Sequence, residues 1–326
     1  MIRLSLSTLL CAFLSVPALA LDSNRADVRE FIEEMTRDYS FDRDELTQLL
    51  AQAETKQAIL DAISRPAERV VPWYEYRQQF LTDTRIRQGT SFWRAHAQRL
   101  AAIGDEGIAQ TVAGILGVET SYGRITGRYR VIDSLTTLAF DYPPRAAFFR
   151  KELQQFLILA REEAVDPKVA LGSYAGAMGS PQFISSSYRN FAVDADGDGH
   201  RDLWSNWDDV IGSVANYLRV HGWRGGEPVF AEATLASPDL AAFDTKSIAL
   251  NESVQSLRDK GVRFETPLPP EAPAMLIVAQ GKNGPLYRVG FNNFYVITRY
   301  NRSNMYAMAV HELGQAVRAT IPDAER

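Results

Sequence analysis

The sequence predicts a mainly helical protein of the α+β class, and three observations support this fold class. The 326-residue chain is 46% hydrophobic and 23% charged, which is typical of a globular protein with a substantial core. Apolar residues recur at helical spacing through much of residues 22–217. Beyond Trp223, frequent prolines separate shorter segments, of which residues 274–279 and 287–291 are expected to be short strands.

The first twenty residues have the organisation of a secretory signal peptide. Arg3 precedes an apolar run over residues 4–16, and Ala18 and Ala20 are the small residues expected beside a cleavage position. The run is too short to span a bilayer of roughly 30 Å, which disfavours a membrane anchor. We therefore expect cleavage after Ala20 and a periplasmic location.

The cysteine and charge content narrows the classes of function further. Cys11 is the only cysteine, and the leucines before it lack the small residue that a lipoprotein signal requires there, so no stable membrane anchor is expected. The mature chain would contain no thiol, which excludes disulfides and thiol catalysis. Loss of Arg3 would bring the net charge from −5 to about −6 with no basic run, so nucleic acid is not an expected partner.

Changes in composition divide the chain into a signal peptide (1–20) and three further parts. Residues 21–100 are expected to form an N-terminal helical domain. Residues 101–230 contain the chemically suggestive motifs and are expected to be the catalytic core. Residues 231–326 carry the short strands and a final helix.

Helix boundaries in these parts can be read from capping and spacing. Asp42 followed by Glu45 is the pattern of a capped helix start. A further helix is expected at about residues 91–103, after a break at prolines and aromatic residues. The final helix, at about residues 303–320, has an apolar stripe that is expected to pack in the core, made of Met305, Met308, Ala309, Leu313 and Val317.

Glu119 is the first residue that indicates chemistry. It continues a helical stripe formed by Ile108, Val112 and Ile115, so its carboxyl group is expected to face inward. Burial and the helix end signalled by Gly123 both disfavour its charged form, which favours a general acid that is protonated at neutral pH. The alternative is a structural carboxylate paired with Arg124 or Arg128.

A run of small residues at 173–183 is the second indication. Small side chains allow an extended polymer to approach the backbone closely. Ser173 and Gln182 could bind hydroxyl and acetamido groups of sugars, and aromatic side chains provide flat faces for sugar rings. The alternative is tight helix packing.

A third motif follows the pattern of a calcium loop. Asp194, Asp196 and Asp198 alternate, Gly199 occupies the sixth position of an EF-hand loop, and His200 would contribute its backbone carbonyl. The usual Glu at the twelfth position is replaced by Ser205, so Asp209, or less favourably Asp208, must close the site. The alternative is a solvated acidic turn.

Taken together, these motifs closely resemble the membrane-bound lytic murein transglycosylase B family, glycoside hydrolase family 103. The matching segments are 117–123 (GVETSYG), the 173–183 run, the acidic loop, 212–217 (GSVANY) and 221–223 (HGW). Further similarity lies in 140–143 (FDYP), 148–153 (FFRKEL) and 293–303 (NFYVITRYNRS). The resemblance extends from about residue 70 to the C-terminus and, more loosely, over the helical start of the chain.

The resemblance implies a lysozyme-like catalytic core with an EF-hand-like calcium loop at 194–209, a helical domain and a small strand-containing region that completes the glycan groove. It assigns the catalytic acid to Glu119 and glycan contacts to Ser173, Gln182, Tyr217, Tyr300 and Asn301. It also implies a structural calcium ion held by Asp194, Asp196, Asp198, His200 and Asp209, with no organic cofactor. Two departures from the family pattern are Thr120-Ser121-Tyr122 and the missing lipid-attachment cysteine, which favours a soluble form.

The expected reaction is cleavage of the MurNAc-β-1,4-GlcNAc bond of peptidoglycan glycan strands with formation of 1,6-anhydro-MurNAc ends. Glu119 would serve as the sole acid and base. The alternatives are a hydrolytic muramidase of the lysozyme type and a non-catalytic, calcium-dependent peptidoglycan-binding protein. Partners among proteins of cell-wall synthesis or remodelling are also conceivable, and the sequence identifies none.

Overall fold

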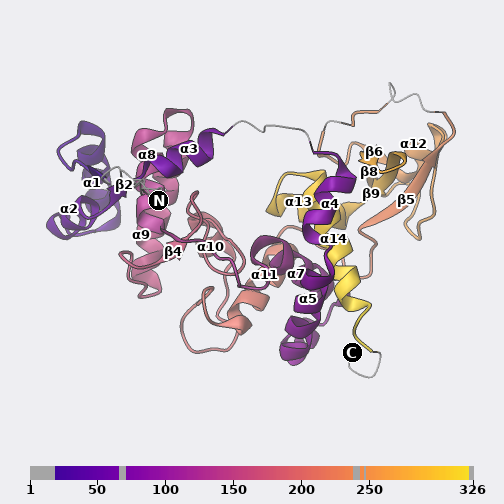
Figure 1. Ribbon diagram of the computed structural model, residues 1–326, viewed down its shortest axis with the longest axis horizontal. Helices are drawn as coiled ribbons and strands as arrows, with labels where there is room; N and C mark the ends of the chain where they lie inside the picture. Colours follow the sequence, from indigo (N-terminus) through magenta and orange to yellow (C-terminus); the bar gives the residue numbers. More distant parts are fainter. Residues whose placement is uncertain (1–18, 66–70, 238–242, 246, 323–326) are drawn as a thin grey trace, which may run out of the picture.

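The computed structural model describes residues 19–65, 71–237, 243–245 and 247–322. Figure 1 shows a helical group at one end, a sheet at the other, and between them the helices α5 (Asp83–Ala95), α7 (Glu106–Thr120), α11 (Trp207–Val220) and α14 (Asn304–Arg318). No helix in the described ranges combines the length and apolarity needed to cross a membrane.

The helical group combines segments that are far apart in the sequence. The helices α1 (Ala26–Tyr39), α2 (Arg43–Ala51) and α3 (Gln57–Ser64) lie beside α8 (Val131–Asp141) and α9 (Ala146–Glu162). An ion pair of 2.6 Å between Arg25 and Asp141 and an edge-to-face contact of Phe31 with Phe140 join the two sets. The domain boundaries at residues 100 and 230 stay a prediction.

The predicted capped start of a helix at Asp42 is confirmed. The Asp42 side chain accepts a hydrogen bond of 2.9 Å from the backbone N–H of Glu45, at the first turn of α2. This bond satisfies one of the backbone donors that a helix start leaves without a helical partner.

The predicted signal peptide lies largely outside the described residues. Its last two residues form β1 (Leu19–Ala20), which pairs with β2 (Glu54–Thr55). The next residue, Leu21, is buried and donates a backbone hydrogen bond of 2.9 Å to the Ala53 carbonyl. Cleavage after Ala20 stays a prediction, and it would leave this anchor of the mature chain in place.

The central helix α7 (Glu106–Thr120) packs along α14 (Asn304–Arg318). The two helices approach so closely that a Cβ atom on Gly114 would lie 2.1 Å from the Val310 carbonyl oxygen. A Cβ atom on Gly314 would lie 2.3 Å from the Gln110 carbonyl oxygen. The apolar stripe predicted for α14 does pack in the core, although Met305 is only partly buried.

Gly114→Ala is expected to destabilise the protein despite the better helix propensity of alanine. Propensity favours alanine by about 1 kcal/mol, but the added methyl group must displace the backbone of α14, and overpacking costs roughly 1–3 kcal/mol. Thermal unfolding should show a lower Tm. Gly107→Ala is the matched control, because its Cβ would meet only side-chain atoms at 3.2 Å. Equal Tm values for Gly114→Ala and the unchanged protein would contradict this account of the contact.

Several shorter helices surround this pair. The helical stretch expected at residues 91–103 is present, but it starts earlier and is interrupted: α5 spans Asp83–Ala95, and α6 (Ala97–Ala102) follows after a break at His96, whose φ is −120°. The His96 ring lies 4.9 Å from Phe92 and 5.3 Å from Trp207, so aromatic contacts hold it at the break. The other elements of this region are α4 (Trp73–Phe80), β3 (Tyr129–Arg130), η1 (Pro143–Arg145), β4 (Leu171–Gly172), α10 (Ser185–Phe191), α11 (Trp207–Val220) and α13 (Asn292–Tyr300).

The C-terminal part contains an antiparallel sheet with strand order β6-β8-β9-β5-β7. The two predicted strands are present but longer, as the hairpin of β8 (Pro273–Gly281) and β9 (Gly284–Gly290). This part also contains three strands and one helix that were not expected from the sequence, namely β5 (Phe230–Leu235), β6 (Glu252–Ser253), α12 (Val254–Asp259) and β7 (Val262–Arg263). A separate apolar cluster lies on this sheet.

Candidate active site

Glu119 lies in the last turn of α7, where the helix ends abruptly. Ser121 and Tyr122 have φ values of 50° and 60°, and Gly123 follows with 76°. Three successive residues in the left-handed region cannot continue an α-helix. The Thr120 hydroxyl donates 2.8 Å to the Ser180 carbonyl, so the end of α7 is fixed against the 173–183 run.

The Glu119 carboxyl group is bonded to a tyrosine. The Tyr306 hydroxyl donates a hydrogen bond of 2.7 Å to Oε1 of Glu119. Burial raises the pKa of Glu119 to about 7, and the bond from Tyr306 opposes that rise. No ion pair joins Glu119 to Arg124 or Arg128 in the part of the chain that the structure describes, unlike the alternative of a paired structural carboxylate.

The charge of the same carboxyl group acts on two more tyrosines. Tyr76 comes from α4, and Tyr300 is the last residue of α13. Burial, together with the Glu119 charge, raises the pKa of Tyr76, Tyr300 and Tyr306 above the usual range of a phenol. The three hydroxyls therefore stay protonated at neutral pH and can act as hydrogen-bond donors.

Ser173 and Gln182 are both partly exposed, and they hold the small-residue run in shape. Ser173 Oγ accepts from the backbone N–H groups of Ala175 and Ala177, at 3.3 and 3.0 Å. Gln182 has a φ of 54°, and its amide donates to the carbonyls of Thr126 and Gly179 at 3.0 and 2.9 Å. The Ser173 hydroxyl hydrogen and the Gln182 side-chain oxygen take part in none of these bonds.

Tyr217 and Tyr300 meet around the same run. The Tyr217 hydroxyl donates 2.7 Å to the Arg299 carbonyl, and the Tyr300 hydroxyl donates 2.6 Å to the Pro181 carbonyl. Their ring centroids lie 4.8 Å apart. Tyr217 is buried, whereas Asn301 is exposed just beyond α13. The structure thus gathers Gln182, Tyr217 and Tyr300, and none of the interactions described here joins Asn301 to them.

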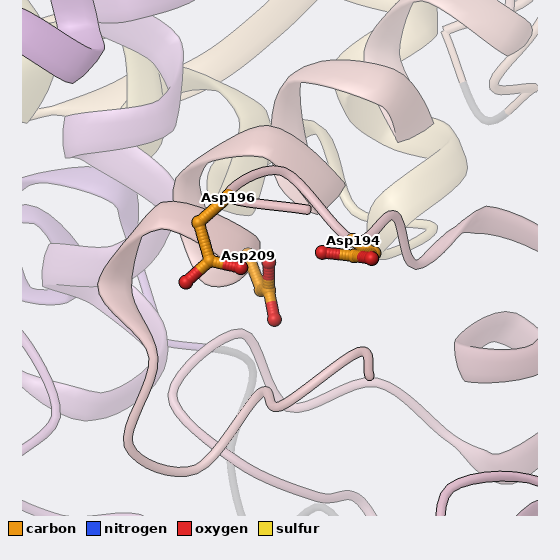
Figure 2. A group of neighbouring side chains, drawn as sticks. All are labelled: Asp194, Asp196 and Asp209. Carbon is orange, nitrogen blue, oxygen red and sulfur yellow. The ribbon is translucent and has the colours of Figure 1, made fainter. Parts of the chain in front are cut away.

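The acidic loop brings three of its predicted ligands together (Figure 2). Carboxylate oxygens of Asp194, Asp196 and Asp209 all lie within 4.8 Å of one another. Asp209 is completely buried, and burial is the main cause that raises its pKa, with the charges of Asp196 and Asp194 adding to it. Three carboxylates at this spacing repel one another unless a cation lies among them.

The other predicted ligands are placed differently. The Asp198 carboxylate is not part of this group and accepts 2.8 Å from the backbone N–H of His200. Asp208, the less favoured candidate for closing the loop, forms an ion pair of 2.6 Å with Arg99 and lies outside the group. Asp209 is therefore the carboxylate of α11 that faces the loop.

Comparison with known proteins identifies the family. A family model described as the transglycosylase SLT domain matches residues 23–315. The chain belongs to this family. It is 40% identical over 307 residues to membrane-bound lytic murein transglycosylase B of Escherichia coli (strain K12), covering 90% of this chain and 83% of that protein.

Solved structures of other transglycosylases have the same fold. Soluble lytic transglycosylase SltB1 from Pseudomonas aeruginosa is 52% identical, with a TM-score of 0.86 over 89% of this chain and 98% of that chain. Escherichia coli lytic transglycosylase Slt35 in complex with calcium is 38% identical, with a TM-score of 0.83 over 93% and 96% of the two chains. The predicted family, fold class and enzyme class are confirmed.

Tyr306 and Tyr76 are neighbours of the transglycosylase site that the sequence did not indicate. Tyr306 is separated from Glu119 by 187 positions in the sequence, and it lies next to Met305 of a stripe interpreted as core packing. Tyr76 belongs to an aromatic cluster that the sequence marks only as a break between helices. Helical spacing alone could not have distinguished either residue from a packing aromatic.

Proposed function

We propose that this transglycosylase cleaves the MurNAc-β-1,4-GlcNAc bond of peptidoglycan and closes a 1,6-anhydro ring on the muramoyl sugar, with Glu119 as the only acid and base. The observation that carries the proposal is a carboxyl group with a pKa of about 7 at the end of α7. No second carboxylate of the described residues contributes to that pKa. A glycosidase pair would place two carboxyl groups about 5–9.5 Å apart.

The steps follow from one group acting twice. Protonated Glu119 donates its proton to the glycosidic oxygen as the bond to C1 breaks, and the acetamido group of the sugar can stabilise the positive charge at C1. The Glu119 carboxylate then takes the proton of the C6 hydroxyl, whose oxygen attacks C1. The proton returns to the enzyme, and no water is consumed.

The other site residues would hold the strand in the groove. Ser173, Gln182, Tyr217, Tyr300 and Asn301 are proposed as glycan contacts, with the free hydroxyl hydrogen of Ser173 and the amide oxygen of Gln182 directed to sugar groups. SltB3 from Pseudomonas aeruginosa, 31% identical with a TM-score of 0.77, has been solved in complex with NAG-anhNAM-pentapeptide. This relative supports peptidoglycan as the substrate class.

Mass analysis of the products tests the reaction type. Purified sacculi should release muropeptides that are one water lighter than the products of hydrolysis, because the C6 hydroxyl replaces water as the nucleophile. Products with reducing ends would show a muramidase instead. Binding to sacculi without any soluble product would show a non-catalytic binding protein.

The Tyr306 hydrogen bond predicts a shift in the pH profile. Since Glu119 must be protonated to act as the acid, kcat/KM should fall as the pH rises above about 7. Tyr306→Phe removes a donor that stabilises the carboxylate, so the falling limb should move to higher pH, and the rate at its plateau should decrease. Tyr295→Phe, on the neighbouring helix, is the control. An unmoved limb in Tyr306→Phe would contradict this role.

We further propose that the acidic loop binds a structural calcium ion. Asp194, Asp196 and Asp209 provide hard oxygen ligands at suitable spacing. Asp198 and the His200 carbonyl would complete the site. The related Slt35 has been solved in complex with calcium. An ion there would join the loop after α10 to the first turn of α11.

The remaining proposals concern location. The N-terminal sequence pattern supports export to the periplasm with cleavage after Ala20, where the proposed substrate lies. The missing lipid-attachment cysteine supports a mature form without a membrane anchor. Any protein partners in cell-wall synthesis or remodelling have yet to be identified.

A further inference from the structure

Two arginines directly follow the helix that carries Glu119. Arg124 and Arg128 are both exposed. Neither has a carboxylate within ion-pair distance among the residues that the structure describes, although Arg128 lies 5.7 Å from the centre of the Tyr129 ring. Arg124 and Arg128 therefore present two positive charges in one short loop of a protein whose net charge is −5.

Exposed apolar side chains gather around the same loop. Ile125 is 69% exposed, Leu171 45% and Tyr174 40%. The segments that carry them touch: a Cβ atom on Gly127 would lie 2.0 Å from the carbonyl oxygen of Gly172. We name Arg124, Ile125, Arg128, Leu171 and Tyr174 the basic-apolar patch.

This patch is continuous with the candidate active site. The Thr126 carbonyl, in the middle of the loop, accepts the hydrogen bond from the Gln182 amide. Tyr174 directly follows Ser173, and Arg124 lies five residues after Glu119. A ligand seated on the patch would therefore extend outward from a strand bound beside Glu119.

We propose that the basic-apolar patch binds the stem peptide attached to the muramoyl sugar and that Arg124 and Arg128 bind its carboxylates. The inference rests on the proposed function, since it takes peptidoglycan as the substrate. A stem peptide combines small apolar side chains with several free carboxylates, which matches exposed apolar groups beside unpaired guanidinium groups. An anionic membrane surface would suit the same chemistry, but continuity with Gln182 and Ser173 favours the substrate.

The test measures kcat/KM of the unchanged enzyme and of one double variant on three substrates. The substrates are glycan strands with intact stems, strands whose stem carboxylates have been converted to amides, and strands stripped of stems by an amidase. For Arg124→Gln/Arg128→Gln, kcat/KM on intact stems should fall about 3- to 10-fold, the size expected for two exposed charge pairs, mainly through a higher KM. Rates on the other two substrates should equal those of the unchanged enzyme.

The matched control is Arg87→Gln/Arg263→Gln, which removes the same charge from exposed positions on α5 and β7 and should leave the preference for free carboxylates intact. Equal losses on all three substrates, or no loss on intact stems, would overturn the proposal. The proposal would also be overturned if the Arg124→Gln/Arg128→Gln variant kept its preference for free stem carboxylates but no longer bound phosphatidylglycerol vesicles. Failure of the proposed function looks different: the unchanged enzyme would then release no anhydro-ended product from any substrate.

Discussion

Glu119→Gln is expected to lower the rate of anhydro-muropeptide release by roughly 10²- to 10⁴-fold, the usual loss when a positioned acid or base is removed. The amide keeps the shape of the side chain and can still accept the hydrogen bond from Tyr306. It cannot donate a proton to the glycosidic oxygen or take one from the C6 hydroxyl. The loss should appear in kcat, measured by chromatography of a sacculus digest, with little change in binding to the sacculi.

Stability measurements separate this loss from misfolding. Folding raises the pKa of Glu119, so protonation of this group stabilises the folded state. This contribution is fully present below pH 4.5 and is lost as the pH rises through about 7. Glu119→Gln should therefore gain Tm relative to the unchanged protein between pH 5 and pH 8. Glu45→Gln, at an exposed position of α2, is the control. Near-normal turnover by Glu119→Gln would eliminate the assignment of the acid.

Removal of calcium is expected to lower the Tm by about 4 °C. An ion present at one hundred times its Kd stabilises the folded state by about 2.7 kcal/mol, and each kcal/mol shifts the Tm by roughly 1.5 °C in a chain of this length, because the entropy of unfolding is about 2.1 cal/mol/K per residue. Without the ion, Asp194, Asp196 and the buried Asp209 are left to repel one another. Thermal unfolding with and without a chelator measures the effect.

Readdition and substitution provide the controls for this result. Calcium added back in excess should restore the Tm, and magnesium should restore less of it, because a smaller ion needs closer ligands. Asp196→Asn should show a weaker response to chelation, whereas Asp44→Asn, an exposed acid of α2, should respond like the unchanged protein. A Tm that does not respond to chelation would show that no ion supports the fold.

Much of the site could be predicted because its signals are local in sequence. The stripe of Ile108, Val112 and Ile115 oriented Glu119 within its own helix, and the alternating aspartates marked the acidic loop. The preference for Asp209 over Asp208 agrees with the structure, which places Asp209 with Asp194 and Asp196. In each case one helix or one loop fixes the relative positions of the residues.

The features that were missed depend on contacts between distant segments. Tyr306 reaches Glu119 only because α14 packs along α7. The strands β5 and β7 were not predicted because β5 pairs with β9 and β7, which lie further along the chain. The alternative in which Arg124 or Arg128 pairs with Glu119 rested on closeness in sequence. The left-handed turn at Ser121 and Tyr122 ends α7 between Glu119 and the two arginines, and neither arginine pairs with Glu119.

The close contact of α7 with α14 also has a consequence for how the enzyme matures. The donor to Glu119 belongs to α14, so the acid lacks that donor until this helix, 187 positions further along the sequence than Glu119, has been made and has docked. A fragment cut before residue 304 would keep Glu119 but lose Tyr306 and the helix that covers Gly114. The proposed acid is therefore complete only in a chain that has been made and folded through α14.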